Sequence, residues 1–466
     1  FKREDMQPVF SFKLRGAYNK IVQLSQAERR RGVICASAGN HAQGVALASH
    51  KLGIEATIVM PRTTPEIKIK AVEQLGGHVI LFGDSYSDAS NHADALCEQS
   101  GKVFIHPYDD PQVIAGQGTI AEEILRQLPT SNLDAVFIPI GGGGLIAGMA
   151  VYLKRHSPHT KIIGVEPIDS AAMFDSIQAG KRIKLKQVGI FADGVAVKQV
   201  GKHTFKLVRE FVDEILLVDT DEICAAIKDI YEDNRSIVEP AGALAVAGLK
   251  KYVLENQVRG QVLAAINSGA NMNFDRMRHV AERTEMGEGR EALFAVSIPE
   301  RPGSFLDFCR IIGDRNITEF NYRMSSRSEA HVFVGISIRT SEEAEAIHQA
   351  LESAQLSSLN LHDNELSKLH IRHMVGGHCD VVENEVLYRF EFPERPGALL
   401  EFLTRAHGRW NISLFHYRNH AAAFGRVLAG IEVPPEEHSE FEAYLDVLAY
   451  PYINETDNLA YAIFLK

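Results

Sequence analysis

The stretch DAVFIPIGGGGLIAGMA, from Asp134 to Ala150, carries the local pattern on which the fold of the first half of the chain depends. A short apolar run is followed by four consecutive glycines, residues 141–144, and then by an apolar segment. This order predicts a buried strand, a glycine turn and a helix. Backbone N–H groups can converge in such a turn and the helix N-terminus adds partial positive charge, so it favours a phosphate. A tight turn alone is the alternative, although it needs only one or two glycines.

The same alternation extends from residue 32 to about residue 270. Apolar runs that predict strands buried on both faces read GVICAS, EATIVM, HVILFG, DAVFIPI, KIIGVEP and QVLAAINSG. Amphipathic stretches between them predict helices, among them HAQGVALASHKLG, PEIKIKAVEQLGG and AGQGTIAEEILRQL. This alternation predicts an α/β fold with parallel sheets and helices on both faces. Such sheets bind ligands outside the carboxyl ends of their strands, so functional residues are expected just after strands.

Two further strand ends carry polar residues. The turn CASAGNHAQG places Ser37, Asn40 and His41 at its apex, where side-chain donors and helix N–H groups suit a carboxylate or an aromatic hydroxyl. A plain helix cap would use the same residues. Ser268 ends a third strand, where its hydroxyl could meet a ring nitrogen or cap the next helix. Glu239 precedes Pro240 at a predicted helix start, and the helix dipole alone explains a carboxylate there.

Lys13 lies between Phe12 and Leu14 in SFKLRGAYNK, just after Ser11, which is able to begin a helix. By itself this pattern does not distinguish a solvated lysine from a reactive one. A phosphate cradle, a carboxylate-sized loop and a strand-end serine elsewhere in the chain change that interpretation. Pyridoxal phosphate, a phosphate-bearing cofactor that bonds covalently to lysine, would use all of these groups.

The last third of the chain contains a duplicated segment. IPERPGSFLDFCRIIGDRNITEFNYR begins at Ile298, and FPERPGALLEFLTRAHGRWNISLFHYR begins at Phe392. Each copy predicts the order β-α-β-β-α-β of a ferredoxin-like α+β unit, with LSKLHIRHM and NLAYAIFLK as the fourth strands. The pair would form a tandem regulatory region, and the alternative is a pair of structural dimerisation modules.

The composition of the chain argues against several classes of function. The chain has 466 residues, 45% of them hydrophobic and 23% charged, which predicts a soluble protein of two or more domains. A net charge of -11 argues against a nucleic-acid partner, and the apolar runs are too short for a membrane span. Five scattered cysteines without a CxxC pair and 19 histidines without HExxH give no support to a metal site. We therefore expect a reducing, cytoplasmic setting, and the absent initiating Met suggests missing upstream residues.

Four motifs in this order, SFKLRGA, SAGNHAQG, GGGGL and NSGANMNFDR, resemble those of the threonine dehydratases, pyridoxal-phosphate enzymes of the tryptophan-synthase-β type (fold type II). The duplicated segment resembles the amino-acid-sensing, ACT-like regulatory region of the biosynthetic members. The resemblance covers nearly the whole chain, and the sequence departs from the family only in that the first residues of the catalytic domain are expected to be missing. It implies a catalytic domain over residues 1–285, with a small subdomain over roughly 32–118, and ACT-like units over 290–375 and 385–466.

Carried over by motif, the resemblance implies a role for each candidate residue. Lys13 would bind the cofactor as a Schiff base and take the α-proton of the substrate. Asn40 would face the 3-hydroxyl of the cofactor, and Ser268 its ring nitrogen, where a neutral serine would favour β-elimination. The phosphate would be held by Gly141, Gly142, Gly143, Gly144 and Leu145, and the substrate carboxylate by Ser37, Ala38, Gly39, Asn40 and His41.

The implied reaction is the conversion of L-threonine to 2-oxobutyrate and ammonia, the first committed step of isoleucine biosynthesis. Isoleucine would inhibit it through the C-terminal region, with valine as a candidate activator and a homotetramer as the usual assembly. The Arg-Pro-Gly turns supply candidate effector loops, although Pro-Gly is also an ordinary turn pair, and their residues are Arg301, Gly303, Arg395 and Gly397. Alternatives are serine dehydratase, serine racemase, threonine synthase or a non-catalytic amino-acid sensor.

Overall fold

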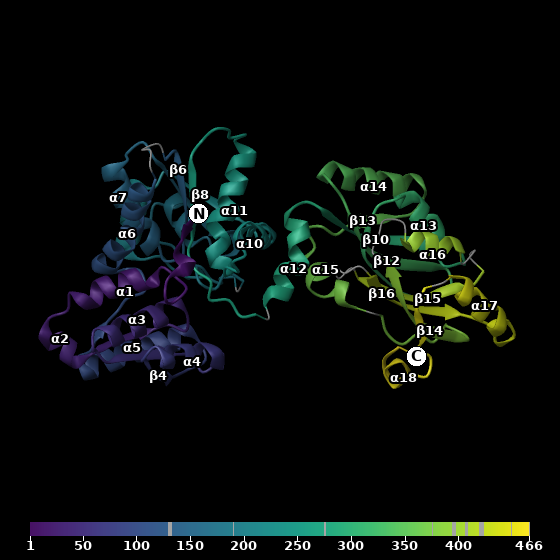
Figure 1. The fold of residues 1–466 in the computed structure, drawn as a ribbon, viewed down its shortest axis with the longest axis horizontal. Coiled ribbons are helices and arrows are strands. Elements are labelled where there is room, and N and C mark those ends of the chain that lie inside the picture. Colours follow the sequence, from purple (N-terminus) through teal and green to yellow (C-terminus); the bar gives the residue numbers. More distant parts are fainter. Residues whose placement is uncertain are drawn as a thin grey trace. The chain divides into compact units, whose positions relative to one another are not determined.

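A computed structural model describes residues 1–128, 133–189, 191–274, 276–374, 376–393, 398–405, 409–418, 424–448 and 450–465. The chain divides into two compact units, Phe1–Gly287 and Glu288–Lys466 (Figure 1). The predicted α/β class of the first unit and the α+β class of the repeats are both confirmed.

The larger sheet of the first unit has five parallel strands in the order β1-β9-β6-β7-β8. These strands are β1 (Lys2–Arg3), β9 (Leu263–Asn267), β6 (Ala135–Pro139), β7 (Lys161–Pro167) and β8 (Glu214–Val218). Its helices are α6 (Pro111–Gln127), α7 (Gly144–His156), α8 (Ala172–Gln178), α9 (Lys202–Phe211), α10 (Thr220–Asn234), α11 (Pro240–Glu255) and α12 (Arg276–Gly287). Short 3-10 helices η1 (Glu4–Met6) and η2 (Ile168–Ser170) complete this part.

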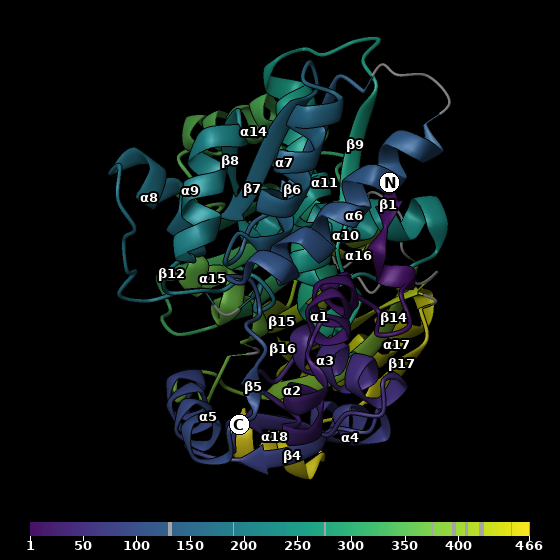
Figure 2. The same cartoon turned by 90° about the vertical axis from the view of Figure 1, so that its left-hand side faces the viewer.

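The smaller sheet has four parallel strands in the order β4-β3-β2-β5. These are β2 (Val33–Ala36), β3 (Ala56–Met60), β4 (His78–Leu81) and β5 (Val103–Phe104). Its helices are α2 (Gln26–Arg31), α3 (Asn40–Lys51), α4 (Glu66–Gln74) and α5 (Tyr86–Ser100). The helix α1 (Lys13–Val22) packs against both α3 and α6, and therefore joins the two sheets (Figure 2).

All six strands predicted for this unit are present, because each apolar run is flanked by turn residues that end it. One burial prediction was wrong: β4 is not buried on both faces, since His78 is exposed and Leu81 retains 43% exposure at the edge of the sheet. Three strands were not predicted from the sequence. Two of them, β1 and β5, have only two residues each, and the third, β8, lies at the edge of its sheet.

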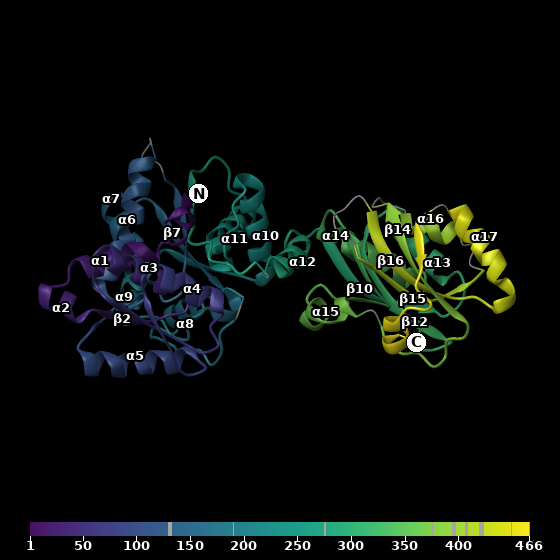
Figure 3. The same ribbon diagram turned by 60° about the horizontal axis from the view of Figure 1, so that its bottom comes forward.

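The second unit is built on one antiparallel sheet (Figure 3). Its eight strands follow the order β13-β10-β12-β11-β15-β16-β14-β17. The first repeat contributes β10 (Glu291–Pro299), α13 (Ser304–Ile312), β11 (Ile317–Arg323), β12 (Glu329–Ser337), α14 (Ser341–Ser353) and β13 (Ser358–Asn360). The second contributes β14 (Glu385–Pro393), α16 (Ala398–Arg405), β15 (Asn411–Arg418), β16 (Phe424–Glu432), η4 (Pro435–Glu437), α17 (His438–Leu448) and β17 (Tyr452–Asn454). Their second strands, β11 and β15, pair with each other, so the repeats share one sheet with mirrored strand order.

The prediction of the fourth strand was wrong in both repeats. The segment LSKLHIRHM forms α15 (Glu365–Leu369) and η3 (Ile371–His373), and NLAYAIFLK forms α18 (Leu459–Phe464). The fourth strands are the short β13 and β17, which precede these helices. The physical reason is an asparagine cap: Asn364 accepts from the Ser367 N–H, and Asn458 accepts from the Ala460 N–H.

Candidate active site

Lys13 is the first residue of α1, and its amine points into the first unit. Its Nζ donates a hydrogen bond to the backbone oxygen of Pro107 at 3.1 Å. The residue keeps some solvent exposure, yet its amine lies deep enough that burial lowers its pKa to about 8, while the Glu239 carboxylate acts in the opposite direction. Lys13 is therefore a lysine that loses its proton far more readily than a solvated one.

The serine before it does not begin the helix, contrary to the prediction. The N-cap of α1 is Phe12, which makes no side-chain cap. Ser11 instead forms an isolated β-bridge with Gly269, and the Phe12 N–H donates to the Ser268 oxygen at 3.2 Å. The start of α1 is thus fixed against the end of β9 by backbone contacts.

The loop after β5 connects Lys13 to the glycine run, and the sequence reading missed it. Tyr108 follows Pro107, and a Cβ added to Gly142 would lie 2.2 Å from the Tyr108 ring. The Tyr108 hydroxyl donates to the Gln199 oxygen. The next residue, Asp109, accepts from three backbone N–H groups at the start of α9. In the sequence, the only sign of this loop is the run of polar residues that follows the short apolar strand β5.

The glycine run, residues 141–144, lies at the carboxyl end of β6 and leads into α7, as predicted. Gly143 is the N-cap of α7 with a φ of +93°, a left-handed conformation that side-chain-bearing residues rarely adopt. The Thr204 hydroxyl donates to the Gly142 oxygen at 2.7 Å, so this carbonyl of the run already has a partner. Leu145 lies in the first turn of α7 and is buried.

The turn from β2 to α3 holds the predicted carboxylate-binding residues together. Ser37 accepts from the Gly39 N–H at 3.3 Å, and α3 begins at Asn40. The His41 ring contacts the Ile105 oxygen at 2.8 Å, and burial together with the nearby Lys13 lowers its pKa to about 3. His41 therefore offers its backbone N–H, and not a charged ring, to a ligand. Gly44, one turn further, allows α3 to approach the backbone of Lys13, because an added Cβ would lie 3.1 Å from it.

Ser268 lies just beyond β9 and is buried. Its hydroxyl donates to the Ala241 oxygen in the first turn of α11 at 3.1 Å. The next described helix, α12, begins only at Arg276, so the alternative that Ser268 caps that helix does not hold. Its oxygen stays a neutral polar group at a strand end, beside the start of α1.

Glu239 belongs to the same site, although the sequence explained it by the helix dipole alone. It is the N-cap residue of α11, but its side chain caps no backbone N–H. Its Oε1 accepts from Asn40 Nδ2 at 2.6 Å, and Asn40 Oδ1 accepts from Asn271 Nδ2 at 2.6 Å. Burial raises the pKa of Glu239 to about 7.

A phosphate-bearing aldehyde cofactor fits this donor set. The glycine run offers backbone N–H groups for a dianion, and Lys13 offers an amine of lowered pKa that can bond to the aldehyde carbon. Within the part of the chain that the structure describes, the side chains of Ser11 and Asn267 have buried polar atoms without a hydrogen-bond partner. A buried polar atom without a partner in the chain can be satisfied by a ligand or an ordered water.

The candidate effector residues lie in the second unit. Arg301 and Gly303 border a pocket that extends across both repeats and is lined further by Phe305, Leu306, Phe402, Leu403, Trp410, Asn411, Phe441 and Tyr444. Gly303 is the N-cap of α13 with a φ of +91°. Arg395 and Gly397 lie outside the described residues.

The described residues show neither a metal-binding cluster nor a helix able to span a membrane. They contain no group of three or more His, Cys, Asp or Glu side chains that could hold a metal ion. None of their helices combines the length and the apolar character that crossing a bilayer requires.

The sequence matches two family patterns. Residues 1–269 match a family described as pyridoxal-phosphate dependent enzyme, and residues 282–371 and 377–465 match the C-terminal regulatory domain of threonine dehydratase.

Individual proteins agree with these families. The chain is 56% identical over 468 residues to L-threonine dehydratase biosynthetic IlvA of Burkholderia multivorans, covering 100% of this chain and 92% of that protein. It is 51% identical over 465 residues to its counterpart in Escherichia coli, with 100% and 90% covered. Among solved structures, processed threonine deaminase isoform 2 of Solanum lycopersicum superposes with a TM-score of 0.59 at 54% identity, over 60% of this chain and 81% of that one.

Proposed function

The chain belongs to the family of pyridoxal-phosphate-dependent biosynthetic threonine dehydratases, and on that premise we propose the part that each site residue takes in the reaction. The enzyme converts L-threonine to 2-oxobutyrate and ammonia, the first committed step of isoleucine biosynthesis, and uses pyridoxal phosphate as its cofactor. It is feedback-inhibited by isoleucine through its C-terminal regulatory region.

Lys13 is the proposed attachment point of the cofactor and the carrier of the α-proton. Bound pyridoxal phosphate supplies a conjugated ring that takes up the electron pair left when that proton departs. A pKa of about 8 leaves the Lys13 amine only about one unit above neutral pH, so a proton can both reach and leave Nζ there. The Pro107 oxygen, 3.1 Å away, orients the amine between transfers.

The remaining site residues bind and orient. Residues 141–144 and Leu145 would hold the phosphate with backbone N–H groups and the α7 N-terminus. The turn from Ser37 to His41 would hold the threonine carboxylate at the start of α3. Asn40 would donate to the ring hydroxyl.

Ser268 would face the ring nitrogen. Because its hydroxyl is neutral, Ser268 would offer that nitrogen no formal charge to stabilise a proton. Chemistry supplied by the bound ring would then favour loss of the β-hydroxyl over transamination. The observation that carries the assignment is the convergence on Lys13: Phe12 contacts the Ser268 backbone, Pro107 holds the amine, and Tyr108 contacts the glycine run.

For regulation, the pocket that Arg301 and Gly303 border is the proposed isoleucine site. Its lining from Phe305, Leu306 and Phe402 suits an aliphatic side chain, and Arg301 with the α13 N-terminus suits a carboxylate. Arg395 and Gly397 would supply the equivalent loop of the second repeat. Valine would oppose isoleucine, and differential binding to two states of a homotetramer would supply the coupling.

The proposed setting is the cytoplasm. The five cysteines are all free, as expected in a reducing compartment, and two of the relatives compared above are bacterial.

The test is a 2-oxobutyrate assay on threonine with and without isoleucine. Lys13→Ala should abolish turnover, whereas Lys70→Ala, at an exposed position of α4, should keep it. Substantial dehydratase activity in Lys13→Ala would refute the catalytic assignment. Serine and phosphohomoserine are assayed in parallel, because a preference for either would favour another enzyme of the same cofactor class. Activity without an isoleucine response would refute only the regulatory part.

A further inference from the structure

Glu239 is the N-cap residue of α11, but its side chain does not cap this helix. The backbone oxygen of Glu239 already accepts from the N–H groups of Gly242 and Ala243 at 2.8 and 3.1 Å. The carboxylate makes no cap, although the residue is only 5% exposed. Because burying a carboxylate is costly, its partner must be sought elsewhere.

That partner is the carboxamide of Asn40. Glu239 Oε1 accepts from Asn40 Nδ2, and Asn271 Nδ2 donates to Asn40 Oδ1, both at 2.6 Å. Asn271 Nδ2 also donates to the Val9 oxygen at 2.8 Å, so its own direction is fixed. A flipped Asn40 would place its oxygen against the carboxylate and its N–H₂ against another N–H₂. The two partners therefore allow one orientation, and one hydrogen of Asn40 Nδ2 stays free of them.

The surrounding backbone is shaped to admit this pair. A Cβ on Gly269 would lie 2.4 Å from Glu239 Oε1 and 3.2 Å from Asn40 Nδ2, so only glycine leaves the hydrogen bond room. The Glu239 N–H donates to the Gly269 oxygen at 3.1 Å, and Gly269 also pairs with Ser11, two residues before Lys13. The Glu239 carboxylate raises the pKa of Lys13 against the effect of burial, as expected of a nearby negative charge.

We propose that Glu239 and Asn271 are positioning residues that hold the Asn40 carboxamide in one orientation, so that its free N–H donates to the ring hydroxyl of bound pyridoxal phosphate. This inference rests on the role of Asn40 in the proposed function and adds the residues that set its direction. A donor of fixed orientation binds more tightly than a freely rotating one, because it loses less entropy on binding.

The test is a double-mutant cycle on cofactor affinity, measured by titrating pyridoxal phosphate into apoenzyme. Glu239→Leu should raise the cofactor Kd about tenfold in the wild-type background, the cost of about one charge-assisted hydrogen bond. In an Asn40→Ala background the same change should raise the Kd less than about twofold, because both changes remove the same interaction. Glu239→Gln keeps an acceptor and should stay close to the wild-type affinity. An equal loss in both backgrounds, or no loss in either, overturns the proposal.

A matched control separates positioning from stability. Asp219 is a carboxylate at the N-cap of α10 that does cap its helix, through the Glu222 N–H at 2.8 Å. Asp219→Ala should lower the melting temperature of the apoenzyme and leave the cofactor Kd unchanged. If Glu239→Leu does not fold, Asn271→Ala replaces it in the same cycle, with the same expected coupling and the same contradicting outcome.

The cycle also separates this inference from the proposed function. If Asn40→Ala leaves the cofactor Kd unchanged, both the positioning and the role of Asn40 are wrong. The threonine assay with Lys13→Ala still decides the reaction itself, since it does not depend on Asn40.

Discussion

The amine of Lys13 donates to the backbone oxygen of Pro107 at 3.1 Å, across 94 residues of sequence. A carbonyl can accept this bond whether the amine is charged or neutral, so the contact orients Nζ in both states. The protonation state is decided by the surroundings: burial lowers the pKa to about 8. This relationship leads to the first prediction.

Lys13 in the apoenzyme should titrate near pH 8. Its rate of reaction with an amine-selective reagent can be followed by mass spectrometry of the labelled peptide. This rate should reach half of its maximum near pH 8, whereas an ordinary lysine does so near pH 10.5. Glu239→Gln should move the midpoint lower, because the carboxylate favours the charged amine. A Lys13 midpoint near 10.5 would contradict the burial of the amine.

The same shift predicts a pH effect on stability. Between pH 8 and 10.5 the unfolded chain holds a proton on Lys13 that the folded apoenzyme has lost, so stability should rise with pH across this window. Urea unfolding of wild type and Lys13→Met should show this rise only in the wild type. An equal rise in both would assign it to other groups.

The glycine run should not tolerate a methyl group at residue 142. In Gly142→Ala the Cβ would lie 2.2 Å from the Tyr108 ring, so the loop or the ring must move, which typically costs 1–3 kcal/mol. We expect a lower melting temperature and weaker cofactor binding. Tyr108→Ala in the same chain should recover part of both, and Gly377→Ala, where an added Cβ meets no atom within 4 Å, should change neither.

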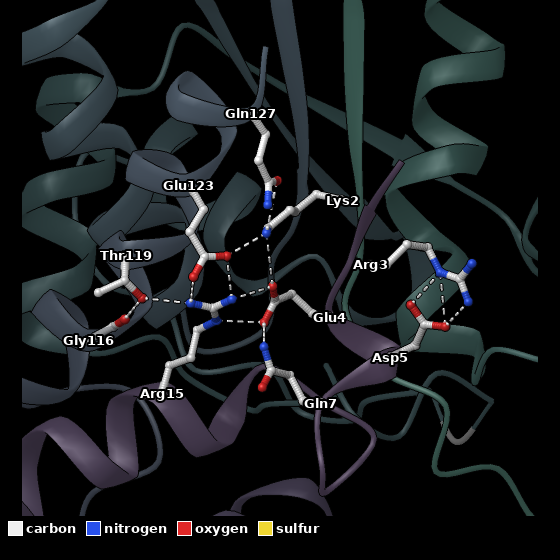
Figure 4. Close-up of polar contacts among 10 residues, drawn as sticks. All are labelled: Lys2, Arg3, Glu4, Asp5, Gln7, Arg15, Gly116, Thr119, Glu123 and Gln127. Atoms are coloured by element: carbon white, nitrogen blue, oxygen red, sulfur yellow. Dashed lines mark hydrogen bonds and ion pairs between the residues drawn. The ribbon is translucent and has the colours of Figure 1, made fainter. Parts of the chain in front are cut away.

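Arg15 should stabilise the first unit through two carboxylates (Figure 4). It forms two hydrogen bonds to Glu4, whose side chain is 1% exposed, and two to Glu123, which also accepts from Lys2. Arg15→Met leaves Glu4 buried without this partner, so urea unfolding should show a loss of about 3–5 kcal/mol. Arg126→Met removes a surface ion pair of α6 and should cost less than about 0.5 kcal/mol.

The ion pair between Arg15 and Glu123 should also affect the stability of the protein at low pH. Hydrogen bonds from Arg15 hold the pKa of Glu123 at about 2, below its ordinary 4.5. This contribution is complete above pH 4.5 and is lost as the pH falls toward 2. Arg15→Met should therefore show a shallower loss of stability over that range, and an unchanged slope would contradict the assignment.

The pocket of the second unit should control inhibition. Leu306→Trp fills it with a larger side chain, and we expect the isoleucine concentration for half inhibition to rise roughly tenfold or more. The readout is 2-oxobutyrate formation over an isoleucine series. Leu359→Trp, at a position with 61% exposure on β13, should keep the wild-type response. An unchanged response in Leu306→Trp would place the effector elsewhere.

Much of the fold could be predicted because its signals are local. Apolar runs ended by turn residues identified six parallel strands, and the repeated PERPG element identified the duplication. The fourth strands were predicted wrongly because a short segment at the end of a repeat can form either a strand or a helix. The caps at Asn364 and Asn458 decided for the helix, and only the pairing of β13 with β10 and of β17 with β14 completed the sheet.

The sequence by itself determined the chemistry available to this protein: a lysine, a glycine run, a polar turn and a strand-end serine, each at a strand end or helix start. Their types and order follow from residue chemistry and local periodicity. Only the tertiary structure decided which neighbours surround them. Pro107 against Lys13, Tyr108 against Gly142, and Glu239 against Asn40 are contacts between distant segments. Such contacts depend on how the two sheets and α1 pack. Burial sets the pKa of Lys13, and hydrogen bonds to Glu239 and Asn271 set the direction of the Asn40 carboxamide.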